Sequence, residues 1–174
     1  RTFGRIDILV NCPVYPEHNP INDPLFMAKY KSVMQTNLEA MVLMTSICVE
    51  HLEKTRGTII NMSSIRSTRP SPQESAYCMA RSGFDMFTKC MATELGPKGI
   101  RVNSVNTGPI GPYPWDPNTP NNRSLELSAK IPAQRLAVSD DLAFAVLFLA
   151  AKEASFITGT NMLVDGGYSA AGLP

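Results

Sequence analysis

Short apolar runs alternate with longer helical segments along this 174-residue chain, and this alternation constrains its fold more than any other feature. We predict strands at Ile6 to Asn11, Thr58 to Met62, Arg101 to Val105 and Asn161 to Val164. We predict helices between them, over about residues 25–54, 74–95 and 142–151, with a short helix and then a long one in the first of these segments. Because strands that are joined through helices run parallel, these elements predict an α/β fold, with a parallel sheet between two layers of helices. We assign residues 1–174 to one domain.

The composition is that of an ordinary globular protein, with 44% hydrophobic and 18% charged residues. A formal net charge of +1 gives no reason to expect nucleic acid or a membrane surface as a partner. No apolar run approaches the roughly eighteen residues that a membrane span needs, and residues 1–5 do not resemble a signal peptide. We therefore expect a cytoplasmic protein.

Residues that bind metals or act as nucleophiles are scattered along the chain. The cysteines stand at positions 12, 48, 78 and 90, with neither a C-x-x-C pair nor metal-ligand spacing, and we interpret them as free thiols in a reducing compartment. The two histidines, His18 and His51, are interpreted as solvated loop or helix residues. We expect no metal site and no Ser-His-Asp triad.

The segment Tyr77-Cys78-Met79-Ala80-Arg81 places a tyrosine and a cation at positions i and i+4 of a predicted helix. Side chains at this spacing lie on one face, so the positive charge of Arg81 can favour the phenolate of Tyr77. A tyrosine that donates and accepts a proton needs such a neighbour. Taken alone, the same spacing is also that of an ordinary surface pair.

Ser64 follows the predicted strand at Thr58 to Met62, at the carboxyl end of that strand. Ligands of open parallel sheets bind at this end. A serine hydroxyl beside Tyr77 could hydrogen-bond a carbonyl oxygen and polarise it for hydride attack. In isolation Ser63 and Ser64 are more typical of a turn or a helix cap, and their register to Tyr77 favours the catalytic interpretation.

With these motifs and several others, the chain resembles the short-chain dehydrogenase/reductase family over essentially all of its length. The other segments that carry the resemblance are Phe3 to Asn11, Thr36-Asn37-Leu38, Ile100 to Val105, Gly108-Pro109-Ile110, Ile157-Thr158-Gly159 and Val164-Asp165-Gly166-Gly167. Residues 76–97 are most similar to the L-xylulose reductase and carbonyl reductase branch. The resemblance implies a Rossmann-like, three-layer αβα fold.

The resemblance also implies that the family's first three strands and its glycine-rich, phosphate-binding turn would precede Arg1. The chain would then be a fragment, the product of a truncated gene model, or a form that depends on a partner. The strand at Ile8 to Val10 would be left without its usual neighbour, which exposes unpaired backbone groups.

The resemblance implies a role for each matching residue. Tyr77 is expected to exchange the proton, Ser64 to orient the carbonyl, and Asn37 to steady a backbone kink and an ordered water. Arg81 stands where the family has a lysine that holds the nicotinamide ribose. The residues expected to contact the cofactor are Asn11, Met62, Tyr77, Arg81, Gly108 and Ile110.

Several positions depart from the family pattern. Arg81 keeps the positive charge of the lysine, but its planar fork is bulkier and does not release a proton near neutral pH. Pro13 and Val14 replace small residues that let the chain pass close to the cofactor, and Thr107 and Pro112 replace a proline and a threonine. Together these changes predict altered or weakened cofactor binding.

The segment from about 107 to 138 is rich in proline, glycine and asparagine in its first part. In the family the corresponding segment closes over the substrate. The residues expected to form this lid are Tyr113, Trp115, Leu125, Leu127 and Ile131. A solvated loop with a small hydrophobic cluster is the other interpretation.

The resemblance therefore implies an NAD(P)-dependent oxidoreductase that moves hydride between nicotinamide and a carbonyl or alcohol carbon of a small molecule. A homo-oligomer, a dimer or a tetramer, is expected. The branch slightly favours NADP. The residue that discriminates NADP from NAD follows the family's second strand, which the resemblance places before Arg1, so the preference is not readable here. Without the glycine-rich turn, we expect weak dinucleotide binding and little or no activity. The alternative is a non-catalytic scaffold that uses the oligomer surfaces of the helices near residues 30–54 and 74–95.

Overall fold

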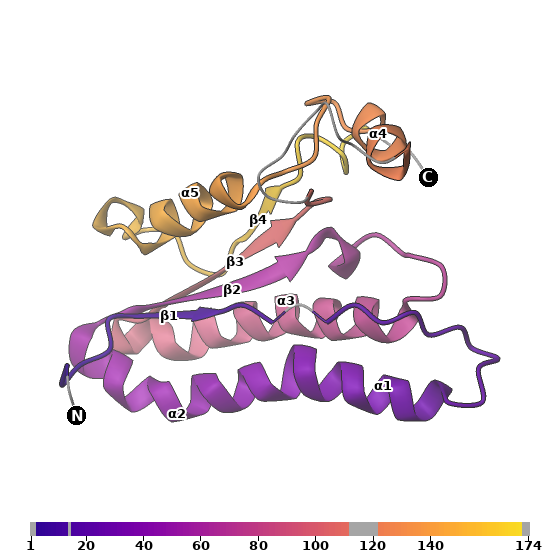
Figure 1. Ribbon diagram of the computed structural model, residues 1–174. Coiled ribbons are helices and arrows are strands. Elements are labelled where there is room, and N and C mark those ends of the chain that lie inside the picture. The colour runs from indigo at the N-terminus through magenta and orange to yellow at the C-terminus, as the bar shows by residue number, and fades with distance from the viewer. Residues whose placement is uncertain (1–2, 14, 112–121, 172–174) are drawn as a thin grey trace.

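A parallel sheet of four strands forms the centre of the computed structural model, which describes residues 3–13, 15–111 and 122–171 (Figure 1). The strands are β1 (Ile8–Asn11), β2 (Thr58–Ser64), β3 (Arg101–Thr107) and β4 (Asn161–Val164), and they lie side by side in this order. The predicted parallel sheet is confirmed, although β1 begins later than predicted and both β2 and β3 continue further. The two central strands continue because their pairing extends to Ser64 opposite Thr107.

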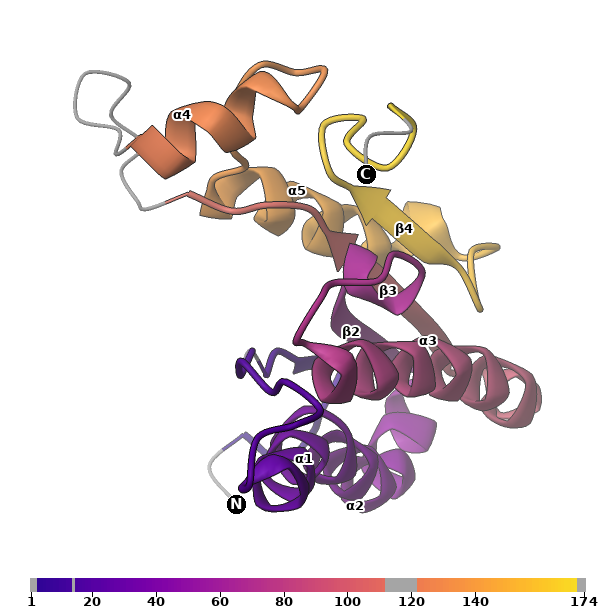
Figure 2. The same cartoon turned by 90° about the vertical axis from the view of Figure 1, so that its right-hand side faces the viewer.

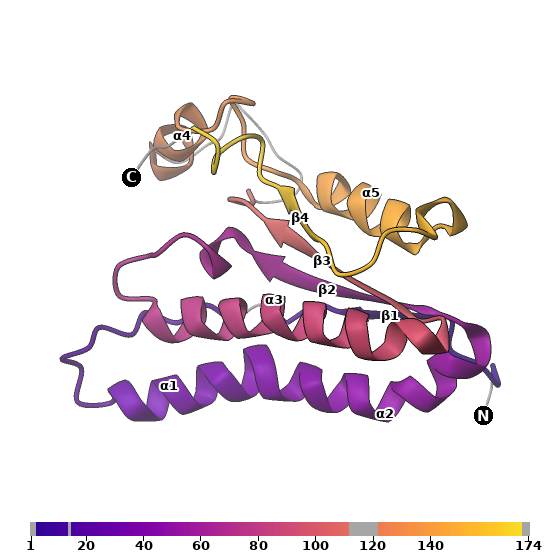
Figure 3. The same cartoon turned by 180° about the vertical axis from the view of Figure 1, so that it is seen from behind.

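Helices cover both faces of the sheet. On one face lie α1 (Phe26–Met34), α2 (Ala40–Thr55) and α3 (Ser75–Leu95), and on the other lies α5 (Ser139–Ala150), as Figures 1 and 3 show from opposite sides. The predicted three-layer αβα arrangement is therefore confirmed. The short helix α4 (Asn122–Ala129) lies with the C-terminal residues beyond the carboxyl ends of the strands (Figure 2).

Three short 3-10 helices and one π-helical turn complete the described part of the chain. The 3-10 helices are Ile65–Ser67, Gly96–Lys98 and Lys152–Ala154. The π-helical turn, Gln35–Glu39, joins α1 to α2 without a break in the chain direction. The predicted helical segment at 25–54 therefore consists of two helices with a distorted junction.

The apolar core is divided by the sheet. Ile59 of β2 packs toward α2 and α3 with Leu52 and Val102, and Ile60 packs toward α5 with Val105 and Leu149. All seven residues of β2 are buried, which is typical of a central strand in a parallel sheet with both faces covered. Each such aliphatic side chain stabilises the fold by about 1.5–3 kcal/mol relative to an exposed one. β2 and β3 are therefore the rigid support on which the candidate site is built.

Among the described residues β1 pairs with β2 alone, so it lies at the edge of the sheet. Its side chains alternate in burial, with Ile8 and Val10 about half exposed and Asn11 buried. In the part of the chain that the structure describes, no helix combines the length and the apolar character that a bilayer crossing needs.

Candidate functional site

A buried guanidinium lies at the centre of the candidate site. Arg81 sits on α3 one turn after Tyr77, and only 1% of its surface is exposed. Its Nη1 donates to the carbonyl of Met62 at 3.1 Å, and its Nη2 donates to the carbonyl of Pro13 at 2.5 Å and to Asn37 Oδ1 at 2.9 Å. The cation thus joins α3, the end of β2, the loop after β1 and the junction of α1 and α2.

Asn37 is held in the π-helical turn, where it is fully buried. Its Nδ2 donates to the carbonyls of Tyr15 at 2.9 Å and Val33 at 3.0 Å. Its Oδ1 accepts the Tyr15 N–H at 3.1 Å as well as the Arg81 N–H. Both amide protons and both lone-pair positions are therefore used within the protein. Single π-helical turns of this kind occur frequently at functional sites.

Tyr77 lies in the first turns of α3 with 7% of its surface exposed. Its ring packs against Val33, Ala76 and Tyr30. The guanidinium carbon of Arg81 lies 4.8 Å from the centre of the ring, so the cation faces the negative π surface of the tyrosine. The predicted pairing of these two side chains on one helix face is present, and it is buried rather than a surface pair.

Ser64 is the last residue of β2 and caps the 3-10 helix that follows. Its hydroxyl oxygen accepts the Arg66 backbone N–H at 3.2 Å. Among the residues that the structure describes, the hydroxyl proton of Ser64 meets no acceptor, so it can be donated to a ligand. The carbonyl of Ser64 faces Asn106 Nδ2 at 3.4 Å.

Two buried polar side chains next to the 3-10 helix Ile65–Ser67 were not predicted as site residues. Asp85, on α3, accepts a hydrogen bond from Asn106 Nδ2 at 2.6 Å, and Asn106 also donates to Ser67 Oγ at 3.0 Å. Both are at least 94% buried, with exposed fractions of 6% for Asp85 and 2% for Asn106. The sequence does contain a signal for Asp85, because Tyr77, Arg81 and Asp85 are spaced four residues apart and therefore lie on one face of the helix.

A cavity of about 230 Å³ opens beside Ser64 at the carboxyl ends of β2 and β3. Gly108 and Ile110, two of the predicted cofactor residues, line it together with Arg66. Gly108 allows the close approach of two chain segments, because a Cβ there would lie 2.6 Å from Asp165 Cβ and 2.7 Å from Asp165 Cα. The full lining consists of Ser64, Ile65, Arg66, Thr107, Gly108, Pro109, Ile110, Leu127 and Tyr168.

The predicted site residues therefore form two groups. Asn37, Tyr77, Arg81 and the carbonyl of Met62 meet in the buried cluster, whereas Ser64, Gly108 and Ile110 line the cavity. Asn11 belongs to neither group. Its Nδ2 donates to Thr45 Oγ1 at 3.1 Å and to Asn61 Oδ1 at 2.9 Å in the core between β1, β2 and α2.

Of the expected lid residues, Ile131 is buried against Leu136 and Tyr168, with Leu127 packed on this group, and Leu125 is about half exposed. The small hydrophobic cluster of the alternative interpretation is thus present. The expected lid residues Tyr113 and Trp115 lie outside the described residues, and so do Val14 and Pro112, two of the positions that depart from the family pattern.

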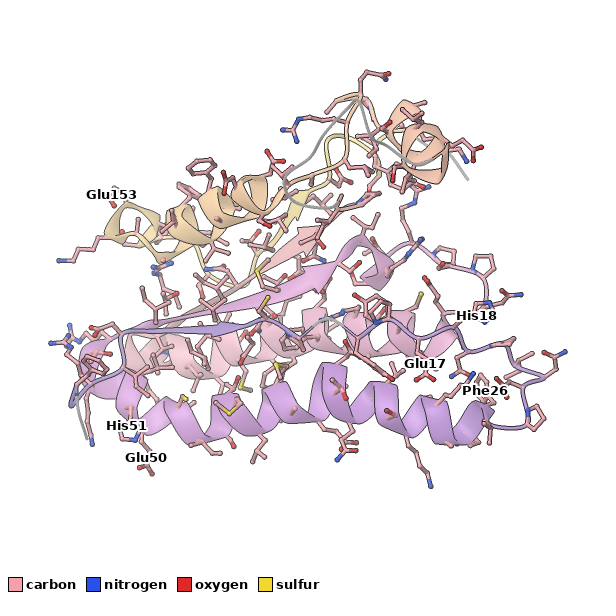
Figure 4. All side chains as sticks on the ribbon, in the orientation of Figure 1. Glu17, His18, Phe26, Glu50, His51 and Glu153 are labelled. Carbon is pink, nitrogen blue, oxygen red and sulfur yellow. The ribbon has the colours of Figure 1, made fainter. Side chains whose placement is uncertain are left out.

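The histidines lie far from each other (Figure 4). His18, on the loop before α1, contacts Gln73, and His51 lies near the other end of this helical layer, on α2. Both are exposed. The four cysteines are unpaired, and the described residues contain no group of three or more His, Cys, Asp and Glu side chains that could hold a metal ion.

Comparisons with known proteins identify relatives of the chain. Residues 1–169 match the family model described as "Enoyl-(Acyl carrier protein) reductase". D-threitol dehydrogenase of Mycolicibacterium smegmatis is 34% identical over 96% of this chain and 64% of its own length. L-xylulose reductase of Caenorhabditis elegans is 31% identical over 90% of this chain and 68% of its own length. The chain therefore spans about two-thirds of the length of these relatives.

Solved structures show the same fold. The crystal structure of acetoin dehydrogenase from Enterobacter cloacae superposes with a TM-score of 0.87 at 30% identity, covering 98% of this chain and 67% of the other. The predicted Rossmann-like fold is thereby confirmed.

Proposed function

The chain belongs to the short-chain dehydrogenase/reductase family, and on that basis we propose that it acts as an NAD(P)-dependent oxidoreductase on a carbonyl or alcohol carbon of a small molecule. The observation that carries the proposal is the buried Arg81 guanidinium, 4.8 Å from the Tyr77 ring and bonded to Asn37. A tyrosine, a fixed cation and an available serine hydroxyl near the carboxyl ends of parallel strands suit proton exchange with a carbonyl oxygen.

In the proposed mechanism, Tyr77 donates its phenolic proton to the substrate oxygen during reduction and takes it back during oxidation. Arg81 stabilises the negative charge that the phenolate then carries, and it does so without giving up a proton. Ser64 donates its hydroxyl proton to the same substrate oxygen, since its oxygen is already fixed by the Arg66 N–H. The nicotinamide supplies the hydride when it is bound.

The residues present fit the nicotinamide end of such a cofactor. Gly108 and Ile110 bring backbone to the cavity beside Ser64, and the Nε of Arg81 is a buried donor without a hydrogen-bond partner among the described residues. The Nη groups of Arg81, however, bind the carbonyls of Met62 and Pro13. A ribose hydroxyl would have to compete with these bonds, so we expect weak cofactor binding. Either NADP or NAD is compatible, with NADP slightly favoured.

The first test is titration of the purified chain with NADPH and NADH, followed by nicotinamide fluorescence and by the melting temperature. Saturable binding that raises the melting temperature supports the proposal. Turnover is then measured with 2,3-butanedione for the wild type and for Tyr77→Phe. We expect Tyr77→Phe to lose about 100-fold or more in kcat, the usual contribution of a general acid. Equal turnover of the two proteins would exclude the role of Tyr77.

One observation favours a second function, that of a non-catalytic scaffold. The Nη groups of Arg81 donate to main-chain carbonyls, which is the arrangement of a structural residue rather than of one that holds a cofactor. Arg81→Lys discriminates the two functions. A lysine restores a single flexible donor, so it should raise turnover if the chain is a weakened enzyme. A folded chain that binds neither dinucleotide and shows no turnover before or after the change would favour the scaffold.

We further propose that copies of the chain associate through α2 and α3, and that the protein works in the cytoplasm. Leu43 and Ile47 of α2 are 59% and 58% exposed, and Met86 of α3 is 59% exposed. An apolar groove between these helices is lined in part by Val49 and Met91. Exposed apolar surface of this extent is typical of an interface.

A further inference from the structure

In the described part of the chain, one charged side chain lines the cavity beside Ser64. Among the lining residues, Arg66 alone is ionised at neutral pH, and the remaining side chains are apolar or uncharged. Arg66 follows Ser64 by two residues, and its backbone N–H is the group that fixes the Ser64 hydroxyl oxygen at 3.2 Å. The cation and the carbonyl-orienting hydroxyl are therefore held by the same short 3-10 helix.

The guanidinium of Arg66 is only loosely held by the protein. Its Nε lies 3.5 Å from Glu74 Oε2, and its Nη1 lies 3.4 Å from the carbonyl of Pro70. Its Nη2 meets no acceptor in the described part of the chain. A guanidinium has five N–H donors, so most of this capacity remains for a ligand. The side chains of Arg66 and Glu74 are 32% and 31% exposed, and pairs at such exposure contribute little to stability.

The carboxylates on neighbouring elements do not neutralise the cavity. Asp165 accepts the backbone N–H groups of Gly167 at 2.9 Å and Ser169 at 2.8 Å, so its charge is directed into its own turn. A second cation lies behind the wall, because Arg69 donates to the carbonyl of Tyr168 at 2.8 Å and stacks on its ring at 4.7 Å. Among the described residues, Arg66 is therefore the charged group that lines this cavity.

We propose that the substrate of this site carries a carboxylate, which Arg66 binds, so that the enzyme acts on a small oxo acid or hydroxy acid. The proposal rests on the proposed function. A single planar guanidinium matches a carboxylate in a two-point contact. Ile65, Ile110 and Leu127 form apolar wall around the remaining space, which suits a short alkyl segment. A volume of about 230 Å³ holds a small molecule rather than a large one.

The test compares a charged ligand with a neutral ligand of the same oxo-acid skeleton, 4-oxopentanoate and its methyl ester, by calorimetric titration of the purified chain. We expect the wild type to bind the acid about tenfold more tightly than the ester, the effect of one charge-assisted hydrogen-bonded pair in a partly exposed position. In Arg66→Gln this ratio should fall to about one, and Arg66→Lys should retain part of it. The matched control is Arg5→Gln, which removes the same charge from an exposed pair with Asp7 and should keep the ratio.

A second variant tests the competing carboxylate. Glu74→Gln removes the carboxylate that approaches Arg66 among the described residues, so it should tighten acid binding about two- to threefold and leave ester binding as in the wild type. Equal affinities for acid and ester in the wild type, a ratio that survives Arg66→Gln, or no binding of either ligand at its solubility limit would each overturn the inference.

Turnover of the neutral 2,3-butanedione, measured separately, distinguishes the two proposals. Nicotinamide-linked turnover of the diketone without any preference for the acid would overturn the carboxylate inference and keep the oxidoreductase. A preference for the acid that disappears in Arg66→Gln, in a chain without nicotinamide-linked turnover, would support the anion site and count against the oxidoreductase.

Discussion

The guanidinium carbon of Arg81 lies 4.8 Å from the ring centre of Tyr77, and its Nη2 lies 2.9 Å from Asn37 Oδ1. The cation is thus shared between the proposed proton donor and the residue that shapes the π-helical turn. Because the same side chain also binds two main-chain carbonyls, the proposed catalysis and the local fold would depend on one group.

Arg81→Met tests this structural role. It removes the Arg81 donor from the buried carbonyls of Pro13 and Met62, whereas Asn37 Oδ1 keeps the hydrogen bond from the Tyr15 N–H. Since each buried acceptor without a partner costs about 1–3 kcal/mol, we expect the free energy of unfolding to fall by at least about 2 kcal/mol. Urea denaturation measures it, with Arg81→Lys expected to lose less. A variant as stable as the wild type would mean that the cluster does not depend on Arg81.

Gly108→Ala tests the packing that closes the cavity. A Cβ at position 108 would meet the Cβ and Cα of Asp165 at 2.6 and 2.7 Å, so one of the two segments must move. We expect a loss of about 1–3 kcal/mol in stability, the usual cost of overpacking. The matched control is Gly96→Ala, where no heavy atom lies within 4 Å of the added methyl and the backbone angles, φ −53° and ψ −46°, suit any residue. The control should be neutral or slightly stabilising. Equal effects of the two substitutions in thermal unfolding would contradict this account.

The alternation of apolar runs and helical segments was sufficient to predict the parallel sheet and its two helical layers. It could not predict where β2 and β3 end, since Ser64 and Thr107 are polar and become strand residues by pairing with each other. The apolar pattern did not predict the π-helical turn either, because no glycine or proline marks it. The resemblance alone implied a backbone kink at Asn37, which lies in this turn. Its stabilising contacts come from Asn37, whose side chain bonds the carbonyls of Val33 and Tyr15.

For the candidate site, the sequence predicted the pairing of Tyr77 with Arg81 but not what holds Arg81 in place. Its partners include the main-chain carbonyls of Pro13 and Met62. Because every residue has a carbonyl, the sequence does not indicate which of them binds Arg81. The assignment of Asn11 to cofactor binding remains a prediction, and its side chain is engaged in the core. The chemical roles of all these residues await the experiments above.

The pH dependence of stability is expected to include a contribution from Asp141. This residue lies in the first turn of α5. The predicted start at Leu142 had placed it ahead of the helix, so that prediction was wrong by three residues. Hydrogen bonds from Arg135 and from the Val138 backbone N–H lower the pKa of Asp141 to about 2. A carboxyl whose pKa is lower in the folded state stabilises the fold above the unfolded pKa, near 3.8, and loses this effect as the pH falls toward 2.

Asp141→Ala should therefore lower the free energy of unfolding by about 1 kcal/mol near neutral pH, the usual contribution of a helix cap. The difference from the wild type should shrink between about pH 4 and pH 2. Urea denaturation at a series of pH values measures this difference. The control is Asp140→Ala, one position earlier on the same helix turn, which leaves the bonds of Asp141 to Arg135 and to the Val138 N–H in place. A difference that stays constant down to the lowest pH would refute the assignment.

The last prediction concerns association through α2 and α3. Leu43 and Ile47 stand at i and i+4 on one face of α2 and are 59% and 58% exposed, next to the apolar groove toward α3. If a second copy covers this surface, a charge in its centre must be buried without a partner, which costs several kcal/mol. We expect the wild type to sediment as a dimer or a tetramer and Ile47→Glu to sediment as a smaller species. Lys152→Glu, beyond α5 on the opposite face of the sheet, adds a carboxylate outside the proposed interface and should keep the wild-type mass. A wild type that stays monomeric at all concentrations, or an Ile47→Glu variant that associates as the wild type does, would rule this surface out as the interface.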